Sequence, residues 1–345
     1  MAGRKRIEFH DKQISMAHGA GGEASRRLVE GLFQPAFSNP LLDALADAAS
    51  FDAPPGRLAI TADSYVVQPL KFPGGSIGEL AVNGTVNDLA VSGAKPLALT
   101  ATFILEAGLP TEILRREVEA MAAAAKQAHV PIVGGDTKVV EHGKADGMYI
   151  ATTGLGLIDS RAALSPERVA DGDRVLLSGP IGNHGMAIML ARAELQIESD
   201  IHSDTRPLTA LTGALVGRVG NNVRWMRDAT RGGVATVLNE LARDAEVRIT
   251  ISEEAIPVDE PVRGACELLG LDPLQVANEG QFVAVVSADH AEQALETLRD
   301  TPGGERACLI GTIERGPMPR VVARAAYGGT RVVDMLIGDP LPRIC

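Results

Sequence analysis

Aromatic side chains and long apolar runs are both scarce in this sequence. Phe, Trp and Tyr together make up 3% of the 345 residues, whereas hydrophobic residues make up 45%. Any hydrophobic core must therefore be aliphatic. No run is long and apolar enough to span a bilayer, and the basic residues Arg4, Lys5 and Arg6 are not followed by an apolar signal segment. We therefore expect a globular protein without a membrane partner or a secretion signal.

The sequence also has few cysteines and no net positive charge. The three cysteines, Cys266, Cys308 and Cys345, are widely spaced and form no C-x-x-C pair. This spacing is typical of a reducing compartment rather than of a disulfide framework, so it predicts a cytoplasmic location. The formal net charge of −11 argues against a surface for nucleic acid or anionic membrane.

A Walker A loop, G-x-x-x-x-G-K-[ST], is absent, which argues against a P-loop nucleotide hydrolase. Glycine-rich turns can nevertheless offer backbone N–H groups to phosphate oxygens. One such turn contains Gly19, Gly21 and Gly22, and we interpret it as a mobile loop that could close over a nucleotide. A second turn follows Arg231 and opens a helix, whose N-terminus adds partial positive charge.

The pattern of strands and helices predicts two α/β domains, because 345 residues exceed one ordinary core. We expect helices at 25–33, 76–92, 111–129, 184–194, 208–220, 234–245, 260–269 and 289–300. We expect strands at 58–62, 97–104, 130–133, 148–158, 174–178, 247–252, 281–286, 307–314 and 319–325. Strands recur with few helices between them in the first half. This favours an α+β fold, with mixed or antiparallel sheets flanked by helices, over a doubly wound parallel sheet.

Composition changes around residues 159–172, where charged residues, Pro and Gly gather, and we place the domain boundary there. The expected divisions are a glycine-rich segment (1–40), a first domain (41–160), a second domain (170–330) and a flexible tail (331–345). The tail ends in Cys345, and its prolines favour an extended chain. From Gly338 to the end it could span about 23 Å, enough to carry a thiol into a distant cleft. A frayed terminus is the simpler alternative.

Four aspartates, Asp63, Asp88, Asp136 and Asp228, stand at strand ends, in a helix or in helix-opening turns. Small residues adjoin each of them. Any one of them alone would be interpreted as a turn or capping residue. Four together match the oxygen ligands that Mg²⁺ takes when it bridges to phosphates. We therefore predict a magnesium–nucleotide site built from these carboxylates.

Two further ionisable residues are candidates for chemistry. Lys138 follows Asp136 by two residues, so on a strand both side chains point the same way. Glu279 lies in a turn between two apolar segments, and it could act as a general base if burial raised its pKa. Each of them alone would more often be an ordinary surface residue.

Together these segments resemble the PurM-like ATP-binding superfamily, and within it the hydrogenase-maturation carbamoyl dehydratase family. The similarity extends over essentially the whole chain. The superfamily is marked by Asn87-Asp88 followed by Gly93-Ala94-Lys95-Pro96, and the family by the final Pro342-Arg343-Ile344-Cys345. Shorter matches lie at residues 18–22, 61–64, 133–140, 227–233 and 278–280.

The resemblance implies a two-domain PurM-like fold, a homodimer built through the N-terminal sheets, and ATP with Mg²⁺ as cofactors. It assigns Cys345, Glu279 and Lys138 to catalysis. It assigns the four aspartates to the metal. The implied cofactor-binding residues are Gly19, Gly21, Gly22, Asp63, Asn87, Asp88, Asp136, Asp228 and Arg231.

The implied reaction takes place on the tail. A carbamoyltransferase loads the thiolate of Cys345, and ATP then phosphorylates the carboxamide so that its dehydration leaves a thiocyanate. The cyanide passes to iron on a scaffold complex of the HypC–HypD type, as a ligand of the [NiFe] hydrogenase centre. A role for Glu279 as base, supported by Lys138, follows from the same resemblance.

Other functions stay open. A selenophosphate synthetase would need a reactive Cys or selenocysteine near the N-terminal glycine turn, yet the first cysteine is Cys266. A small-molecule kinase or aminoimidazole ribonucleotide synthetase of the same superfamily has no need of a terminal cysteine. A non-enzymatic carrier of the carbamoyl or cyano group would need no Mg–ATP site. A metal chaperone is not supported by any His/Cys cluster.

Overall fold

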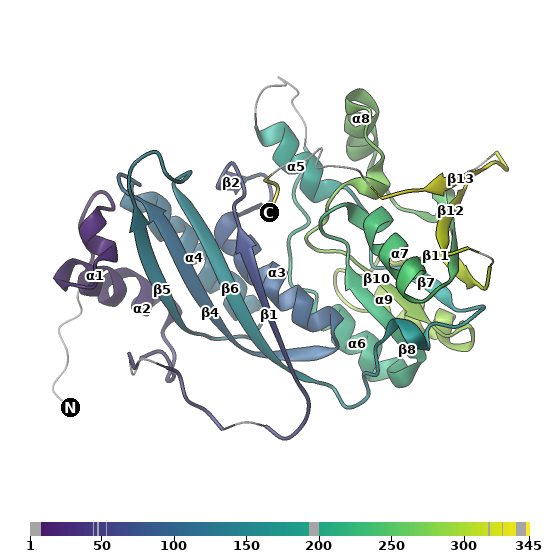
Figure 1. Cartoon of the computed structure of the whole chain (residues 1–345), viewed down its shortest axis with the longest axis horizontal. Helices are drawn as coiled ribbons and strands as arrows, with labels where there is room; N and C mark the ends of the chain where they lie inside the picture. The colour runs from purple at the N-terminus through teal and green to yellow at the C-terminus, as the bar shows by residue number, and fades with distance from the viewer. Residues whose placement is uncertain are drawn as a thin grey trace.

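The computed structural model describes residues 8–43, 45–46, 48–52, 54–192, 200–316, 318–325, 327–335 and 343–345. Figure 1 shows two layered parts side by side, a sheet with helices behind it and a second sheet flanked by helices. Both parts mix helices with largely antiparallel sheets, which confirms the predicted fold class. Within the described ranges, no helix combines the length and the apolarity needed to cross a membrane.

The first sheet has four strands in the order β1-β6-β4-β5. They are Leu58–Tyr65 (β1), Met148–Ile158 (β6), Ala94–Glu106 (β4) and Ile132–Val140 (β5). Strands β4 and β5 run parallel, and the other two pairs are antiparallel. Strands β1 and β5 therefore form the two edges of this sheet.

Helices α3 (Ile77–Val91) and α4 (Thr111–Gln127) cover one face of the first sheet. Helix α4 is rich in Ala, and its Leu114, Val118 and Met121 recur at helical spacing and are buried. Helix α3 is buried on nearly all sides because it lies between the first sheet and the second domain.

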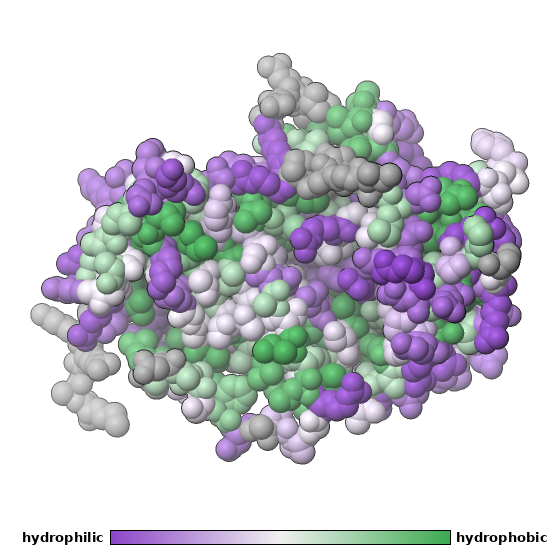
Figure 2. Space-filling model, in the orientation of Figure 1, coloured by the Kyte–Doolittle hydropathy of each residue, from purple (hydrophilic) through white to green (hydrophobic). Residues whose placement is uncertain are grey.

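The opposite face of the first sheet is apolar and partly exposed. Leu58, Ile60 and Ile104 are exposed there, and the strand register places them on one face. Figure 2 shows this face mainly in white and green, with few purple side chains at its centre. An exposed apolar sheet face of this kind is typical of an interaction surface.

The second sheet has seven strands in the order β13-β12-β9-β11-β7-β10-β8. They are Thr330–Val333 (β13), Arg320–Arg324 (β12), Arg248–Ser252 (β9), Cys308–Glu314 (β11), Arg174–Leu177 (β7), Phe282–Val286 (β10) and Val223–Asp228 (β8). Strand β12 runs parallel to β9, and the other neighbours are antiparallel. Helix α7 (Gly233–Asp244) packs on one face, and α6 (Thr209–Val219) and α9 (Ala291–Arg299) pack on the other.

Helices α5 (Asn183–Ala191) and α8 (Glu260–Leu269) lie within the second domain in sequence, but their side chains join the core of the first domain. Met186, Ile188 and Val262 belong to the same buried cluster as the residues of α3 and α4. This shared core joins the two domains. The C-terminus lies at the junction, between α5 and the short strand β2 (Figure 1).

The shorter elements are the helices α1 (Glu23–Leu28) and α2 (Gln34–Phe37) and the hairpin of β2 (Lys71–Phe72) with β3 (Gly75–Ser76). A 3₁₀ turn over Met16–Gly19 precedes α1.

Strands β1, β4 and β5 extend further than the sequence predicts, and the sequence did not predict β2, β3, β8 or β13. Strand β1 continues to Tyr65, and β5 continues through Gly134-Gly135 instead of ending in a turn. Glycine favours a turn in isolation, but here a Cβ on Gly135 would lie 1.8 Å from the carbonyl oxygen of Ala101 on β4. The glycine therefore permits close strand pairing. Strand β8 was missed, and Asp228 is its last residue.

Candidate active site

Three aspartates meet where the two domains face each other. Asp63 comes from β1, Asp88 from α3 and Asp228 from the end of β8. Thr61 donates a hydrogen bond to Asp88 at 2.7 Å, and Thr85 donates one to Asp63 at 3.2 Å. Because alternate residues of a strand share a face, Thr61 and Asp63 both point toward α3.

The pKa values of these carboxyl groups depend on burial and on one another. Burial, followed by the charge of Asp88 and more weakly that of Asp63, raises the pKa of Asp228 to about 7. Burial also raises the pKa of Asp88, against the hydrogen bond from Thr61. The positive charge of Arg227 offsets these effects only in part. A cluster of this composition favours a bound cation.

Glu279 is buried beside this cluster, with 3% of its surface exposed. Burial raises the pKa of Glu279 well above its usual range, and the charges of Asp228, Asp204 and Asp63 raise it further. Arg231, an exposed residue just before α7, opposes this shift. A buried carboxylate of high proton affinity has the property required of a general base.

Neighbouring residues hold the backbone of Glu279 in place. Asp204 accepts a hydrogen bond from its N–H at 3.0 Å, and Asn87 donates to its carbonyl at 3.1 Å. Asn87 also donates to the carbonyl of Arg206 at 3.0 Å and accepts from the N–H of Leu208 at 2.7 Å. The side chain of Asn87, which the sequence suggested for cofactor binding, therefore bonds helix α3 to the second domain.

Asp136 and Lys138 lie together on β5, the opposite edge of the first sheet, and form an ion pair at 2.8 Å. The bond from Lys138 lowers the pKa of Asp136. Gly19 packs against the same strand, so closely that a Cβ there would lie 2.5 Å from the backbone nitrogen of Val139. The glycine turn at 19–22 is thus placed beside this ion pair.

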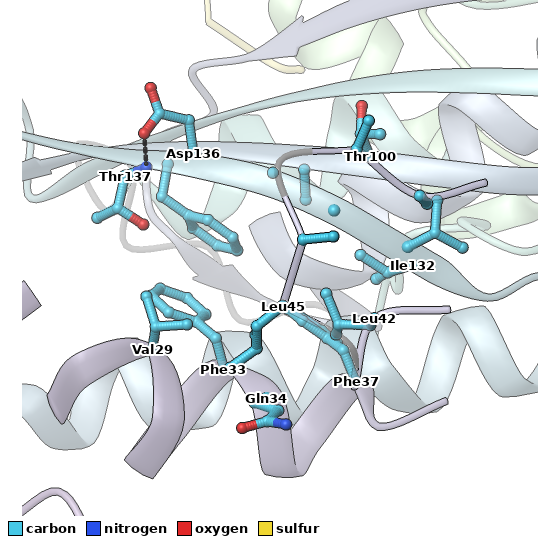
Figure 3. A pocket seen from close by; sticks show the side chains of 18 of the residues that line it. Val29, Phe33, Gln34, Phe37, Leu42, Leu45, Thr100, Ile132, Asp136 and Thr137 are labelled. Carbon is cyan, nitrogen blue, oxygen red and sulfur yellow. Dashed lines mark hydrogen bonds between the residues drawn. The ribbon is translucent and has the colours of Figure 1, made fainter. Parts of the chain in front are cut away.

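These residues line a pocket of about 860 Å³ between the N-terminal helices and the sheet. In Figure 3, Val29, Phe33 and Phe37 point into this pocket, whereas the carboxylate of Asp136 points away from them. The N–H of Thr137 donates to that carboxylate at 2.8 Å. The pocket therefore has an apolar interior and a charged rim.

The two groups of residues are separate within one chain. Strands β6 and β4 lie between β1 and β5, so Asp63 and Asp136 are about 14 Å apart across three strand spacings. The register aligns Asp63 with Gly135, which directs Asp136 to the other face. One group holds Asp63, Asp88, Asp228 and Glu279, and the other holds Gly19, Gly21, Gly22, Asp136 and Lys138. Among the residues described, no three His, Cys, Asp or Glu are close enough to hold a metal ion.

The end of the chain lies at the domain junction. The tail prolines fall outside the described residues, but 343–345 are described. Ile344 is buried with 5% of its surface exposed, and the carbonyl of Cys345 accepts from the N–H of Val66 at 3.1 Å. Val66 directly follows β1, the strand that carries Asp63. The last residues are therefore directed inward.

Sequence reasoning missed several polar residues that shape this region. The pKa of Asp204 is raised by burial, and the hydroxyl of Tyr65 lies 3.4 Å from Asp63. Burial and the charge of Asp63 raise the pKa of Tyr65 well above its usual range. His184, fully buried in α5, bonds to the tail. The only local signal was the polar run at 202–206 before an apolar helix.

Comparison with known proteins shows which family models match this architecture. The model of the AIR synthase related protein, N-terminal domain, matches residues 45–158, and that of its C-terminal domain matches 170–324. Carbamoyl dehydratase HypE of Azotobacter vinelandii is 50% identical over 340 residues, which are 99% of each chain.

Solved structures agree with this result. A HypE crystal structure in complex with ATP matches with a TM-score of 0.92 at 45% identity, covering 96% of this chain and 99% of that one. A chain of a HypE–HypF complex matches with a TM-score of 0.79 at 47% identity, covering 90% and 99%. Identity at this level over nearly the full length confirms the expected resemblance. The chain therefore belongs to the carbamoyl dehydratase HypE family of AIR synthase related proteins.

Proposed function

We propose that this protein uses ATP to dehydrate a carbamoyl group on its own Cys345, which yields a thiocyanate. The observation that carries the proposal is the inward position of the tail, where Cys345 bonds to the residue that follows β1. That strand bears Asp63 of the carboxylate cluster. The related HypE structure with ATP supports nucleotide binding by this chain as well. The product is the cyanide donor for the Fe(CN)₂CO centre of [NiFe] hydrogenase.

The proposed reaction proceeds in two steps. The carboxamide oxygen attacks the γ-phosphorus of ATP, so that a C–O–P bond forms and ADP leaves. Cleavage of the C–O bond then releases phosphate with that oxygen, while the nitrogen loses both protons and becomes triply bonded to carbon. The net change is the loss of water from the carbamoyl group at the expense of one ATP.

Glu279 is the proposed base for the nitrogen protons. Its burial and the neighbouring carboxylates raise its proton affinity, which suits a group that must accept a proton. Lys138 is the proposed partner that orients the carboxamide or supports the base. Within one chain Lys138 is paired with Asp136 on the far edge of the sheet, so this role requires a second copy.

A magnesium ion fits the donor set of the carboxylate cluster. Asp63, Asp88 and Asp228 supply only oxygen donors, and Mg²⁺ commonly binds through one or two carboxylates together with substrate phosphates. The ion would offset charge on the transferred phosphoryl group. The proposed nucleotide ligands beyond the cluster are Arg231 and the glycine turn at 19–22, with Asp136 at the metal.

A homodimer would unite the two groups of residues. An eight-stranded barrel is just wide enough for its side chains to fill, and two four-stranded sheets with apolar faces can form one. If β5 of one copy meets β1 of the other, Asp136 and Lys138 come beside the partner's carboxylate cluster. We propose this arrangement, with residues 1–40 covering the nucleotide, 41–160 dimerising and 170–330 completing the cleft.

The proposed partners follow from the same chemistry. A carbamoyltransferase loads Cys345, and the related HypE–HypF complex supports a maturation protein in that place. An iron-carrying scaffold of the HypC–HypD type accepts the cyanide. The tail must leave the cleft for both exchanges. A cytoplasmic location is proposed with them, since both partners act on a thiol that must stay reduced.

Intact mass spectrometry of the C-terminal peptide tests the proposal. After incubation with the carbamoyltransferase and its substrates, the wild-type peptide should gain a carbamoyl group, and on adding Mg–ATP it should lose one water. Cys345→Ala should show neither change, yet melt within a few degrees of the wild type because the side chain is small. A carbamoyl group that persists with Mg–ATP in the wild type would contradict the proposal.

A further inference from the structure

The last three residues lie antiparallel to the segment that follows β1 and accept two backbone hydrogen bonds from it. The N–H of Val66 donates to the carbonyl of Cys345 at 3.1 Å, and the N–H of Gln68 donates to the carbonyl of Arg343 at 3.3 Å. These two bonds join alternate residues that run in opposite directions. The tail therefore lies antiparallel to the segment that continues from β1. Arg343 is further held by an ion pair with Asp146 at 2.6 Å.

The carbonyl of Ile344 faces the other way, toward the second domain. Nε2 of His184 lies 2.7 Å from this oxygen. The side chain of Ile344 joins the shared core, so the tail is held on one side by backbone pairing and on the other by His184. This bond connects the tail to helix α5 near its N-terminus, and Arg192, the residue that caps the C-terminus of α5, also donates to the carbonyl of Arg343.

The surroundings of His184 fix its orientation. Its Nδ1 lies 2.8 Å from the hydroxyl of Ser203, which in turn accepts from the N–H of Thr205 at 3.1 Å. The ring meets Phe72 of β2 edge-on, with centroids 5.7 Å apart. Because a carbonyl can only accept, Nε2 carries the proton and Nδ1 accepts from Ser203. Burial lowers the pKa of His184, which agrees with a neutral ring.

The loop that orients His184 also holds the proposed base. Asp204, between Ser203 and Thr205, accepts from the N–H of Glu279. One loop therefore sets both the ring that binds the tail and the backbone of the carboxylate that would act on it. This link distinguishes His184 from a core histidine that only fills space.

We propose that His184 is a positioning residue, which holds the inward tail through Ile344 so that the group on Cys345 is presented to the site. Its effect on the reaction rests on the proposed function, whereas its effect on the tail does not. Loss of the bond leaves the tail attached through its other contacts, to Val66, Gln68, Asp146 and Arg192, but increases the fraction that is undocked. Loading, which needs the tail outside, is unaffected or faster, and dehydration is slower.

Alkylation of the C-terminal thiol measures docking directly. Iodoacetamide is added to the full-length protein, and modified Cys345 is quantified by peptide mass spectrometry over time. His184→Leu should be alkylated about fivefold to tenfold faster than the wild type, in line with one lost buried hydrogen bond. His184→Gln, whose amide can still donate, should stay near the wild-type rate. Equal rates for wild type and His184→Leu would overturn the proposal, as would equal acceleration by Leu and Gln.

Two further variants test whether a general loss of packing, rather than the lost bond, explains faster alkylation. Ser203→Ala removes only the hydroxyl that orients the ring, so it should accelerate alkylation in the same direction but less. His290→Leu is the matched control, because it breaks a similar Ser–His bond, to Ser287 at 3.0 Å, at the start of α9. It should leave the alkylation rate of Cys345 unchanged. Acceleration in the control equal to that of His184→Leu would show a general effect and refute the specific role.

Single-turnover experiments separate this inference from the proposed function. With pre-carbamoylated protein, His184→Leu should dehydrate the group more slowly, while the rate of loading stays at or above that of the wild type. If the wild type gives no thiocyanate but alkylation still responds to His184, the proposed function fails and the tail contact stands. If thiocyanate forms at the same rate in wild type and variant, the positioning role is refuted while the function stands.

Discussion

At the scale of single residues, burial changes what the carboxyl groups of this site can do. Glu279 and Asp228 are both buried, and each has its pKa raised first by burial and then by other carboxylates. Asp136, exposed and paired with Lys138, has its pKa lowered instead. The same side chain thus behaves as a base of high proton affinity in one place and as a stable anion in another.

Replacing Glu279 tests its role as the base. Glu279→Gln should still accept the carbamoyl group but form thiocyanate about 100-fold more slowly or worse, because the amide cannot take up a proton. In the wild type the dehydration rate should rise with pH as the raised-pKa carboxyl ionises, and the variant should lose this rise. Single-turnover mass spectrometry across pH measures both effects. A variant with a wild-type yield and pH profile would remove Glu279 from the mechanism.

The raised pKa of Asp228 makes stability depend on pH. Its pKa is about 7 in the folded protein against 3.8 ordinarily, so folding retains a proton that the unfolded chain releases. Stability from this group is full below pH 3.8 and is lost as pH rises toward 7, by an amount on the order of a few kcal/mol. In buffer without magnesium or nucleotide, Asp228→Asn should flatten this part of the profile of unfolding free energy.

The control for this measurement is Asp159→Asn. The pKa of Asp159 is lowered to about 2 by its bonds with Arg161, so its contribution to stability has the opposite sign and is lost as pH falls. That variant should leave the decline between pH 4 and pH 7 in place. A decline that persists unchanged in Asp228→Asn would show that other groups cause it.

At the scale of elements, helix α3 is buried, yet it carries polar residues that make contacts outside the helix. Asp88 faces the carboxylate cluster, and Asn87 makes three hydrogen bonds to the second domain. Close packing on α4 depends on Gly78, where a Cβ would lie 2.2 Å from the carbonyl oxygen of Glu117. The helix therefore fixes the distance between the domains and also positions Asp88, one carboxylate of the proposed site.

Truncation of Asn87 should destabilise the domain junction. Asn87→Ala leaves the N–H of Leu208 and the carbonyls of Arg206 and Glu279 without this partner, so unfolding free energy should fall by about 2–4 kcal/mol. Chemical denaturation measures the change. Dehydration should also slow, because the backbone of Glu279 loses one support.

A matched variant on the same helix is Asn83→Ala. Asn83 is also buried, but its amide makes one bond to Thr205 at 3.2 Å, and its oxygen has no hydrogen-bond partner among the described residues. Its loss should cost about 1 kcal/mol or less. If the two variants were equally destabilised, the bonds of Asn87 would not be what holds the domains together.

At the scale of the whole molecule, one chain carries two separate sets of proposed site residues. The cluster around Asp63 and the pair of Asp136 with Lys138 lie at opposite edges of the first sheet. Exposed strand edges and an apolar outer face are features that a second copy would cover. The proposed dimer therefore explains both the surface and the separation.

Mixing two inactive variants tests the dimer. Asp136→Ala and Asp228→Ala should each be inactive alone, but random mixed dimers contain one intact site in half of the molecules. Activity should return to about a quarter of wild type after subunit exchange. Turnover of the carbamoylated tail measures the recovery. No recovery, with exchange verified by native mass spectrometry, would contradict a site shared between copies.

The elements differ in how far local sequence predicted them. Helix α4 was predicted closely, because its Ala-rich composition and the helical spacing of Leu114 and Val118 both favour a helix. Strand β5 was predicted too short, because Gly134 and Gly135 favour a turn unless a neighbouring strand pairs closely with them. Strand β8 was missed although the turn Gly220–Asn222 precedes it, since charged Arg224 and Arg227 interrupt its apolar residues.

The sequence by itself determined the mixed α/β class and the family, and it singled out the final cysteine as a candidate site residue. These follow from composition, periodicity and short motifs, which depend on neighbours along the chain. Only the tertiary structure decided that Asp63, Asp88, Asp228 and Glu279 meet, and that Asp136 does not join them in one chain. It also turned the tail inward onto His184. Long-range packing sets such distances and the burial that shifts pKa values, and no local pattern contains them.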